Sequence, residues 1–426
     1  MLTSVFSRGR RPALWLTAAV VMVVVAACAA GPVYGPPQPP APTSGPMRDV
    51  LIVGNSGAGT ISFIDPDSFA NLGSVNVVPD IEQRLAQINA SPITAIAYSV
   101  TAQQQHLEKF ERTGGLRWAD DVVLSPDGTT LYVSRSNLSD VVAIDLTRAG
   151  HPVQWHYVIN GFHADHIALS PDGSRLVVSV TTSNTAEILD TATGSKVAQF
   201  PTGAYPHQND WTADGQRIYN ASIGNVGLGY DLNDFKGDRT LQVIDANTYQ
   251  VVRTYGFDRG IRPMVFNDDE SIAYIQLSYL NGLIKFDMDT GTTLATSDQP
   301  LNAFAAENYT SYDVYPHNSA HHGLALSGDR STLCDVGTID NEVSLVDADD
   351  LSVDARVEVG LLPYWATTSL DGTKCFVTMS GTDEIVVIDY ASATIVERIP
   401  TGFFPQRNRL GQMPESELDL LNPAVG

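Results

Sequence analysis

A repeated unit limits what this chain can fold into more than any other feature of its sequence. Within residues 125–145, a Ser-Pro-Asp-Gly turn precedes an alternating segment (130–134), and a second turn precedes an apolar segment (141–144) that ends at Asp145. Pro, Asp and Gly at these positions are typical of tight turns, and the β-branched and aromatic residues between them predict strands. Two strands this short are not stable alone, so we expect the unit to pack against copies of itself.

Copies of the unit recur along most of the chain, and each copy ends in an aspartate. These terminal residues are Asp65, Asp145, Asp190, Asp245, Asp287, Asp347 and Asp389. The shortest spacing is 42 residues, from Asp245 to Asp287 and again from Asp347 to Asp389. That period, with about four strands per unit, is typical of a β-propeller. We therefore predict an all-β fold, a seven-bladed β-propeller with four-stranded blades over residues 50–411.

Two segments carry a resemblance to a known family. The segments His321-His322-Gly-Leu-Ala-Leu-Ser-Gly-Asp329 and Leu189-Asp-Thr-Ala-Thr-Gly194 resemble the YVTN-family β-propeller repeat. The resemblance covers about residues 50–411 and implies a propeller. It implies no single function, because similar propellers include binding proteins, surface proteins and relatives of enzymes.

The first and last copies of the unit complement each other. The first copy lacks an inner strand, whereas residues 401–408 repeat the linker and strand start seen at 202–207. We therefore expect the C-terminal segment to join the first blade and close the ring. Residues 412–426 are expected to form an acidic tail.

The N-terminal segment predicts export. Three arginines precede an apolar run, and the run ends in Val-Ala-Ala before Cys28. This order is typical of a signal peptide, here residues 1–27, with Cys28 as the lipidated first residue of the mature protein. Residues 28–49 are proline-rich and predict an extended tether. The expected location is outside the cytoplasm, anchored to a bacterial membrane, by either the general or the twin-arginine export route.

The net charge bears on the possible binding partners, and the cysteine positions bear on disulfide formation. The formal net charge of −23 argues against nucleic acid, because such a surface repels phosphate. Apart from Cys28, the cysteines are Cys334 and Cys375, one position apart when neighbouring units are aligned. Their side chains should then leave opposite faces of equivalent strands, which predicts two separate buried thiols.

Three insertions interrupt the repeat, at residues 79–119, 224–238 and 302–320, with a helix expected over 101–112. In a four-stranded meander, all three emerge at the same mouth of the central channel. Long loops gathered on one face of a rigid scaffold often build binding sites, so this face is also a candidate surface for a protein partner.

One position in each inner strand is expected to line that mouth. Seven residues before each turn aspartate lie Asp120, Asp165, His207, Arg262, His322 and Tyr364, with Gln406 as the equivalent in the closing strand. We predict Asp120, Asp165, His207 and His322 as ligands for Zn²⁺ or Cu²⁺, since carboxylate and imidazole suit both ions. We predict Arg262, Tyr364, His166 and Gln406 as contacts for a small ligand.

Three functions fit this ring. The first is a lipid-anchored protein that binds a small ligand or a transition metal at the channel mouth. The second, which the resemblance implies, is a channel enzyme of the lactonase or lyase type, with no catalytic residue assigned. The third is a cell-surface scaffold that binds another protein through the inserted loops. A hydrated polar channel without a ligand is the alternative to all three.

Overall fold

The computed structural model describes residues 45–106 and 108–423. The predicted signal peptide, Cys28 and most of the predicted tether lie outside the described residues. In the part that is described, no helix is long and apolar enough to cross a membrane.

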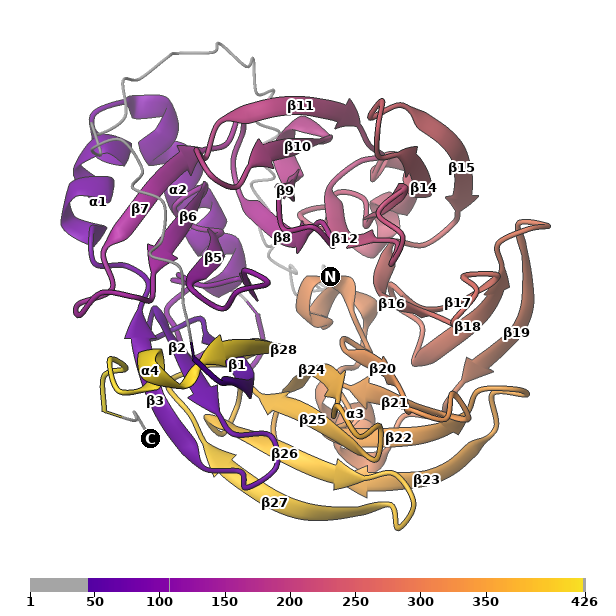
Figure 1. Ribbon diagram of the computed structural model, residues 1–426. Coiled ribbons are helices and arrows are strands. Elements are labelled where there is room, and N and C mark those ends of the chain that lie inside the picture. Colours follow the sequence, from indigo (N-terminus) through magenta and orange to yellow (C-terminus); the bar gives the residue numbers. More distant parts are fainter. Residues whose placement is uncertain (1–44, 107, 424–426) are drawn as a thin grey trace, which may run out of the picture. The chain divides into compact units, whose positions relative to one another are not determined.

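Seven four-stranded antiparallel sheets form a ring, as the repeat predicts (Figure 1). Blade one consists of β28 (Pro405–Pro414), β1 (Met47–Asn55), β2 (Thr60–Ile64) and β3 (Asn71–Asn76). Blade two consists of β4 (Asp121–Leu124), β5 (Thr130–Arg135), β6 (Asp140–Asp145) and β7 (Val153–Val158). Blade three consists of β8 (Ala164–Leu169), β9 (Arg175–Val180), β10 (Thr185–Asp190) and β11 (Lys196–Pro201), with η1 (Thr181–Ser183) between β9 and β10.

The remaining blades follow the same order from the inner to the outer strand. Blade four consists of β12 (Pro206–Trp211), β13 (Arg217–Ser222), β14 (Arg239–Asp245) and β15 (Val251–Phe257). Blade five consists of β16 (Ile261–Phe266), β17 (Ile272–Leu277), β18 (Gly282–Asp287) and β19 (Thr292–Asp298). Blade six consists of β20 (Leu324–Leu326), β21 (Thr332–Gly337), β22 (Glu342–Asp347) and β23 (Val353–Glu358). Blade seven consists of β24 (Pro363–Thr368), β25 (Lys374–Met379), β26 (Glu384–Asp389) and β27 (Thr394–Pro400).

The recurring aspartates act as turn formers. In the first turn of the unit, the Asp127 carboxylate accepts a hydrogen bond from the Thr129 amide at 3.1 Å. At the end of the unit, the Asp145 carboxylate accepts one from the Thr147 amide at 2.9 Å. Such bonds from an Asp side chain to the backbone two residues further on stabilise tight turns. The repeat in the sequence is therefore a repeat of turn geometry.

The hydrophobic core is divided among the contacts between blades. Val50 and Ile52 of blade one pack with Val122 and Leu131 of blade two, for example, and a similar cluster of buried residues lies between each pair of neighbours around the ring. Burying apolar surface in this way is the main favourable term in folding. No blade buries its apolar faces without its neighbours.

The C-terminal strand closes the ring, as predicted. β28 pairs with β1 from Met47↔Pro414 to Asn55↔Pro405 and is the innermost strand of blade one. The strand continues three residues past Gly411, α4 (Glu415–Leu418) follows it, and Ser74 pairs with Asn422 beyond that helix.

The three insertions fold into short helices. The first holds α1 (Ile81–Asn89) and α2 (Pro92–His106), so its second helix lies nearer the N-terminus than the expected 101–112. The insertion at 224–238 holds η2 (Tyr230–Phe235). The third holds α3 (Ala303–Asn308), η3 (Tyr312–Val314) and η4 (Pro316–Asn318).

Cys334 and Cys375 form a disulfide between blades six and seven, with their Cα atoms 6.5 Å apart. The prediction of two separate thiols was therefore wrong, although its premise holds. Neighbouring blades pack face to face, so two side chains that meet between them must leave opposite faces of equivalent strands. Both cysteines lie in the core cluster that these blades share.

Candidate functional site

The predicted ring residues lie where the inner strands begin, and in blades one, three, four, five and seven a local irregularity accompanies them. The pairing of β8, β12, β16 and β24 with the next strand shifts register between Ala164 and Ile167, Pro206 and Asn209, Ile261 and Met264, and Pro363 and Trp365. Pairing of β28 skips Gln406. A β-bulge frees a residue from the ladder and redirects its side chain, and bulges are common beside active sites.

The ring is buried, although almost all of its side chains are polar. The exposed fraction of Asp120, Asp165, His207, Arg262, His322 and Gln406 is 8%, 4%, 4%, 1%, 2% and 1%, respectively. Tyr364 is partly buried. A group this polar is expensive to remove from water unless it is paired, so the partners of each member decide what the ring can do.

A row of aromatic rings crosses the mouth. The imidazoles of His166 and His207 have centroids 4.2 Å apart, and those of His207 and His322 are 5.5 Å apart. The ring of Tyr364 lies 4.3 Å beyond His322. Members of blades three, four, six and seven thus come together, with His166 one position after the shared repeat position that His207, His322 and Tyr364 occupy.

Arg407 lies at the centre of the ring, and it was missing from the predicted site. One of its amino groups contacts Nε2 of His166 and lies 3.8 Å from a carboxylate oxygen of Asp120 and 3.9 Å from one of Asp165. Its guanidinium lies over the Trp365 ring, 4.6 Å from the centroid. The signal was available in the sequence, since Arg407 follows Gln406, but regular strand alternation would turn the two side chains in opposite directions.

The two aspartates of the ring share their environment. Burial and the neighbouring Asp120 raise the pKa of Asp165 well above its usual range. His163 lies beside this pair, with Nε2 3.9 Å from Asp120, and burial lowers its pKa to about 4. This environment favours the protonated form of Asp165. Asp120, His163 and Asp165 form one of two groups whose donor atoms lie within 4.8 Å of one another.

The three neighbouring histidines of this row favour the uncharged form. Burial lowers the pKa of His166, His207 and His322 well below the usual value, and the nearby Arg407 adds to this shift. A neutral imidazole offers one donor and one acceptor nitrogen, and it can ligate a metal ion. Nδ1 of His207 has no hydrogen-bond partner among the described residues.

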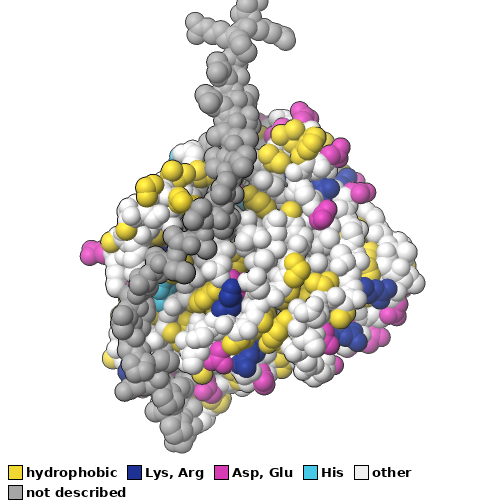
Figure 2. Space-filling model, turned by 90° about the horizontal axis from the view of Figure 1, so that it is seen from above, with side chains coloured by type: hydrophobic (Ala, Val, Ile, Leu, Met, Phe, Trp, Pro, Cys, Tyr) yellow, Lys and Arg dark blue, Asp and Glu magenta, His cyan; other side chains and the backbone are white. Residues whose placement is uncertain are grey.

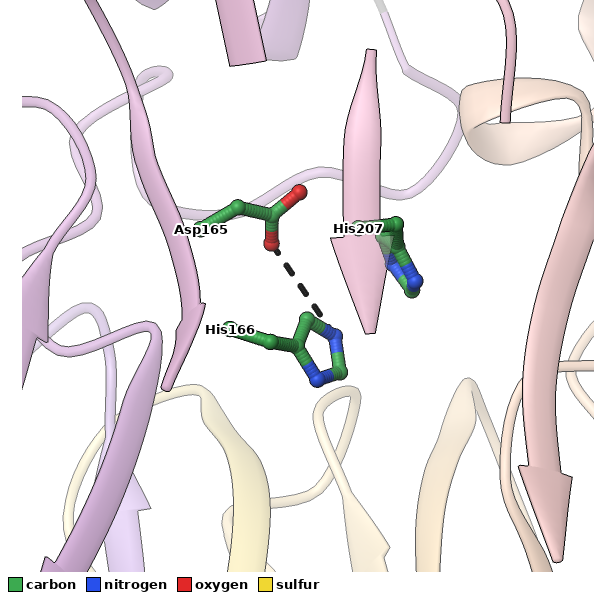
Figure 3. Close-up of side chains that lie close together, drawn as sticks. All are labelled: Asp165, His166 and His207. Carbon is green, nitrogen blue, oxygen red and sulfur yellow. Dashed lines mark ion pairs between the residues drawn. The ribbon is translucent and has the colours of Figure 1, made fainter. Parts of the chain in front are cut away.

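The predicted metal ligands fall into two overlapping groups. Asp165, His166 and His207 bring their donor atoms within 4.8 Å of one another, and Asp120 joins Asp165 in the group with His163. Figure 3 shows Asp165 and His166, which follow each other on β8, facing His207 on the next blade. His322 belongs to neither group. His166, predicted as a ligand contact, takes its place among the possible metal ligands.

Arg262 has few partners. Its Nε donates a hydrogen bond to the Ser278 hydroxyl at 3.1 Å, whereas Nη2 has no partner among the described residues. Burial lowers the pKa of this guanidinium to about 10, so it remains charged at neutral pH. The amide oxygen of Gln406 is likewise buried without a partner in the described part of the chain.

His321 turns away from the ring, although it precedes His322 directly. Its Nδ1 lies 2.9 Å from the carboxylate of Asp335, between blades five and six. Burial alone would lower the pKa of His321, but Asp335 and Asp340 raise it to about 9. This charged pair belongs to the packing of the blades.

The three insertions meet over the mouth and form what we call the cap (79–119, 224–238 and 302–320). Phe110 of the first stacks on Phe304 of the third, with ring centroids 5.8 Å apart. Tyr230 of the second packs on Tyr312 of the third at 4.6 Å. The hydrophobic contacts thus join all three insertions.

A buried ionic group also joins parts of the cap. The Glu108 carboxylate lies 2.6 Å from both Nδ1 of His317 and an amino group of Arg117. Burial would raise the pKa of Glu108, but these two partners lower it to about 2. Arg117 acts on the pKa of Tyr364, and both Arg117 and His317 act on that of His163, so this group lies within electrostatic reach of the ring.

Comparison with known proteins does not assign the chain to a family. No protein-family model matches the chain, and no curated protein is significantly similar to it.

Proposed function

We propose that this protein is a lipid-anchored extracytoplasmic propeller, similar to YVTN-repeat proteins, that binds a small ligand in the capped mouth of its channel. The observation that carries this proposal is the cap itself. A hydrated polar channel needs no cover, yet three separate insertions meet above the ring and its polar side chains are buried. Ordering such loops costs conformational entropy, and burying unpaired polar groups costs desolvation energy. A bound ligand would offset both costs.

The disulfide supports the extracytoplasmic part of the proposal. Cys334 and Cys375 are joined, and disulfides persist mainly in oxidising compartments outside the cytoplasm.

A scaffold that binds through the inserted loops is an alternative. On the face shown in Figure 2, hydrophobic side chains form several small groups with charged residues between them. The inserted loops expose Ile96 of α2, Phe235 of η2 and Val314 of η3, and a protein partner would contact such apolar side chains.

Thermal unfolding of the mature chain tests ligand binding. We would measure the melting temperature with Zn²⁺, Cu²⁺, small sugars, amino acids and small organic acids in separate samples. A ligand at a hundred times its Kd stabilises the folded state by about 2.7 kcal/mol. We expect at least one class to raise the melting temperature of the wild type and of the control Arg253→Met, but not of His207→Ala. Arg253 is exposed on β15, outside the cap, whereas His207 is in the ring. No shift with any class would contradict the proposal.

A transition metal is the second candidate ligand, favoured by the clustered donors of Asp165, His166 and His207. These residue types suit Zn²⁺, or Cu²⁺ in a flatter arrangement. The contact between Arg407 and Nε2 of His166 counts against it, because a cation repels a metal ion. Elemental analysis after incubation with either ion tests this candidate: less than about a tenth of an equivalent in the wild type would eliminate it, whereas metal that is lost in His207→Ala would support it.

A further inference from the structure

Two buried arginines at the channel mouth have hydrogen-bond donors without partners among the described residues. Arg262 and Arg407 are 1% and 2% exposed. Nη2 of Arg262 and both Nε and Nη1 of Arg407 have no hydrogen-bond partner among the described residues. A buried guanidinium is usually paired with a carboxylate through close, often bidentate hydrogen bonds.

Neither arginine has such a pair. Arg262 bonds only to the Ser278 hydroxyl, and in the described part of the chain no carboxylate lies within ion-pair distance of it. Arg407 lies 3.8 Å from Asp120 and 3.9 Å from Asp165, which is too far for a hydrogen bond. By contrast, Arg117 and Arg409 are paired with acids at 2.6 Å and 2.7 Å. Among the buried arginines of the described residues, Arg84 and Arg135 are also paired with acids at 2.9 Å and 2.7 Å, so the two at the ring are the ones without a carboxylate at hydrogen-bond distance.

Two imidazoles near these arginines complement an anion. Both guanidinium groups act electrostatically on His207 and His322, so these imidazoles lie within reach of both. Nδ1 of His207 is also unpartnered among the described residues. Two kinds of donor thus lie near one another: the two guanidinium forks and the imidazole of His207.

We infer that the ligand of the capped channel mouth is a small oxyanion, either a carboxylate-bearing organic molecule or an inorganic oxyanion, held between Arg262 and Arg407 with His207 and His322 beside it. This inference rests on the proposed function and names its ligand class. Both sources offer the oxygen acceptors that a guanidinium fork matches. The overall charge of −23 makes non-specific anion binding elsewhere unfavourable, so anion binding by this protein requires a local positive site.

The test is thermal unfolding and titration calorimetry of the mature chain with two groups of probes. Acetate and succinate form the organic arm, phosphate and sulfate form the inorganic arm, and sodium chloride at equal ionic strength is the reference. We expect at least one arm to raise the melting temperature above that in chloride, and the arm that does so identifies the source. In Arg262→Met, the apparent Kd for that probe should rise at least tenfold.

Two variants separate binding from structure. Removing a buried, unpaired charge should leave the melting temperature of ligand-free Arg262→Met equal to or above that of the wild type. Should this variant not fold, Arg262→Lys keeps the charge but loses the fork, and it should also weaken anion binding. The matched control is Arg253→Met, which removes the same charge from an exposed position on β15 and should bind like the wild type.

Other results would overturn the inference. It fails if neither arm stabilises the wild type, or if stabilisation is undiminished in the Arg262 variants. If anions fail while a metal ion or a neutral molecule stabilises the protein in a His207-dependent manner, the proposed function stands without the oxyanion. If no probe of any class has an effect, the oxyanion inference and the proposed ligand-binding function both fail.

Discussion

Neighbouring residues in this protein can have opposite electrostatic environments. His321 and His322 follow each other before β20, yet burial lowers the pKa of His322, whereas Asp335 and Asp340 overcome burial and raise that of His321 to about 9. The repeat predicted that His322 would face the channel. The repeat also predicted that His321 would lie near the same mouth. Its imidazole instead pairs with Asp335 on β21, and the sequence gives no sign of this contact.

The charged state of His321 predicts a pH-dependent stability. Its pKa is near 6.5 in the unfolded chain and about 9 in the folded one, so folding favours the protonated form. The resulting stabilisation, on the order of 3 kcal/mol, is fully present below pH 6.5 and is lost as pH rises through about 9. The difference in free energy of unfolding between wild type and His321→Gln, from denaturant titrations, should therefore shrink across that interval. The exposed control His106→Gln should show no such trend, and a constant difference would contradict the assignment.

The disulfide gives a second prediction for individual residues. Cys334 and Cys375 are 41 residues apart, and a cross-link over a loop of this length is expected to stabilise the folded state by about 3 to 4 kcal/mol. A reductant should lower the melting temperature of the wild type. It should leave a Cys334→Ala/Cys375→Ala variant unchanged, and that variant should unfold at a lower temperature than the oxidised wild type. An equal effect of reductant on both proteins would exclude this cystine as its cause.

Among the strands, the turns made the fold predictable from sequence, whereas local irregularities hid part of the site. Each unit carries its own turn aspartates, so strand order and ring closure followed from the pattern. The bulges in the inner strands have no such signature. In a regular strand, the side chains of Gln406 and Arg407 would point to opposite faces. Because β28 skips Gln406 in its pairing with β1, this rule does not apply, and Arg407 contacts His166 on blade three.

The closing strand predicts a strong effect of truncation. β28 is the inner strand of blade one, and it also contacts blades two and seven through Arg409 with Asp121 and through the Asn408 carbonyl with Thr367. Deleting the chain from Phe403 onward would expose the edge of β1 and leave Asp121 without its arginine. We expect a large fall in the melting temperature or insoluble protein. A deletion from Pro423 onward is the control, and an unchanged melting temperature after the longer deletion would refute closure by this strand.

For the whole molecule, the sequence located the mouth but not the contacts that cover it. The three insertions were expected on one face because of their places in the meander. Their meeting depends on pairs such as Phe110 with Phe304 and Glu108 with His317, which are about 200 residues apart and outside the repeat. Without a repeat to align, such pairs leave no periodic signal. The disulfide was missed for a related reason. The alignment of Cys334 and Cys375 was correct, but whether the two side chains meet depends on how neighbouring blades pack against each other.

The location of the protein gives the last prediction, which concerns the whole chain. Removing residues 1–27 takes away three arginines and no acids, so the formal charge changes from −23 to −26. Such a protein is repelled by anionic lipid headgroups. In our proposal, membrane attachment comes from the lipid on Cys28. A single acyl chain binds only weakly, so stable anchoring requires more than one.

Cell fractionation of Cys28→Ala tests this anchor. The wild type should fractionate with the membrane and resist a high-salt wash, because acyl chains are insensitive to salt. The variant should either appear in the soluble fraction or accumulate with its signal peptide uncleaved, which mass spectrometry distinguishes. The Arg253→Met variant, changed on the propeller surface, should fractionate like the wild type. A processed Cys28→Ala protein that stays with the membrane after the salt wash would show that another part of the molecule holds it there.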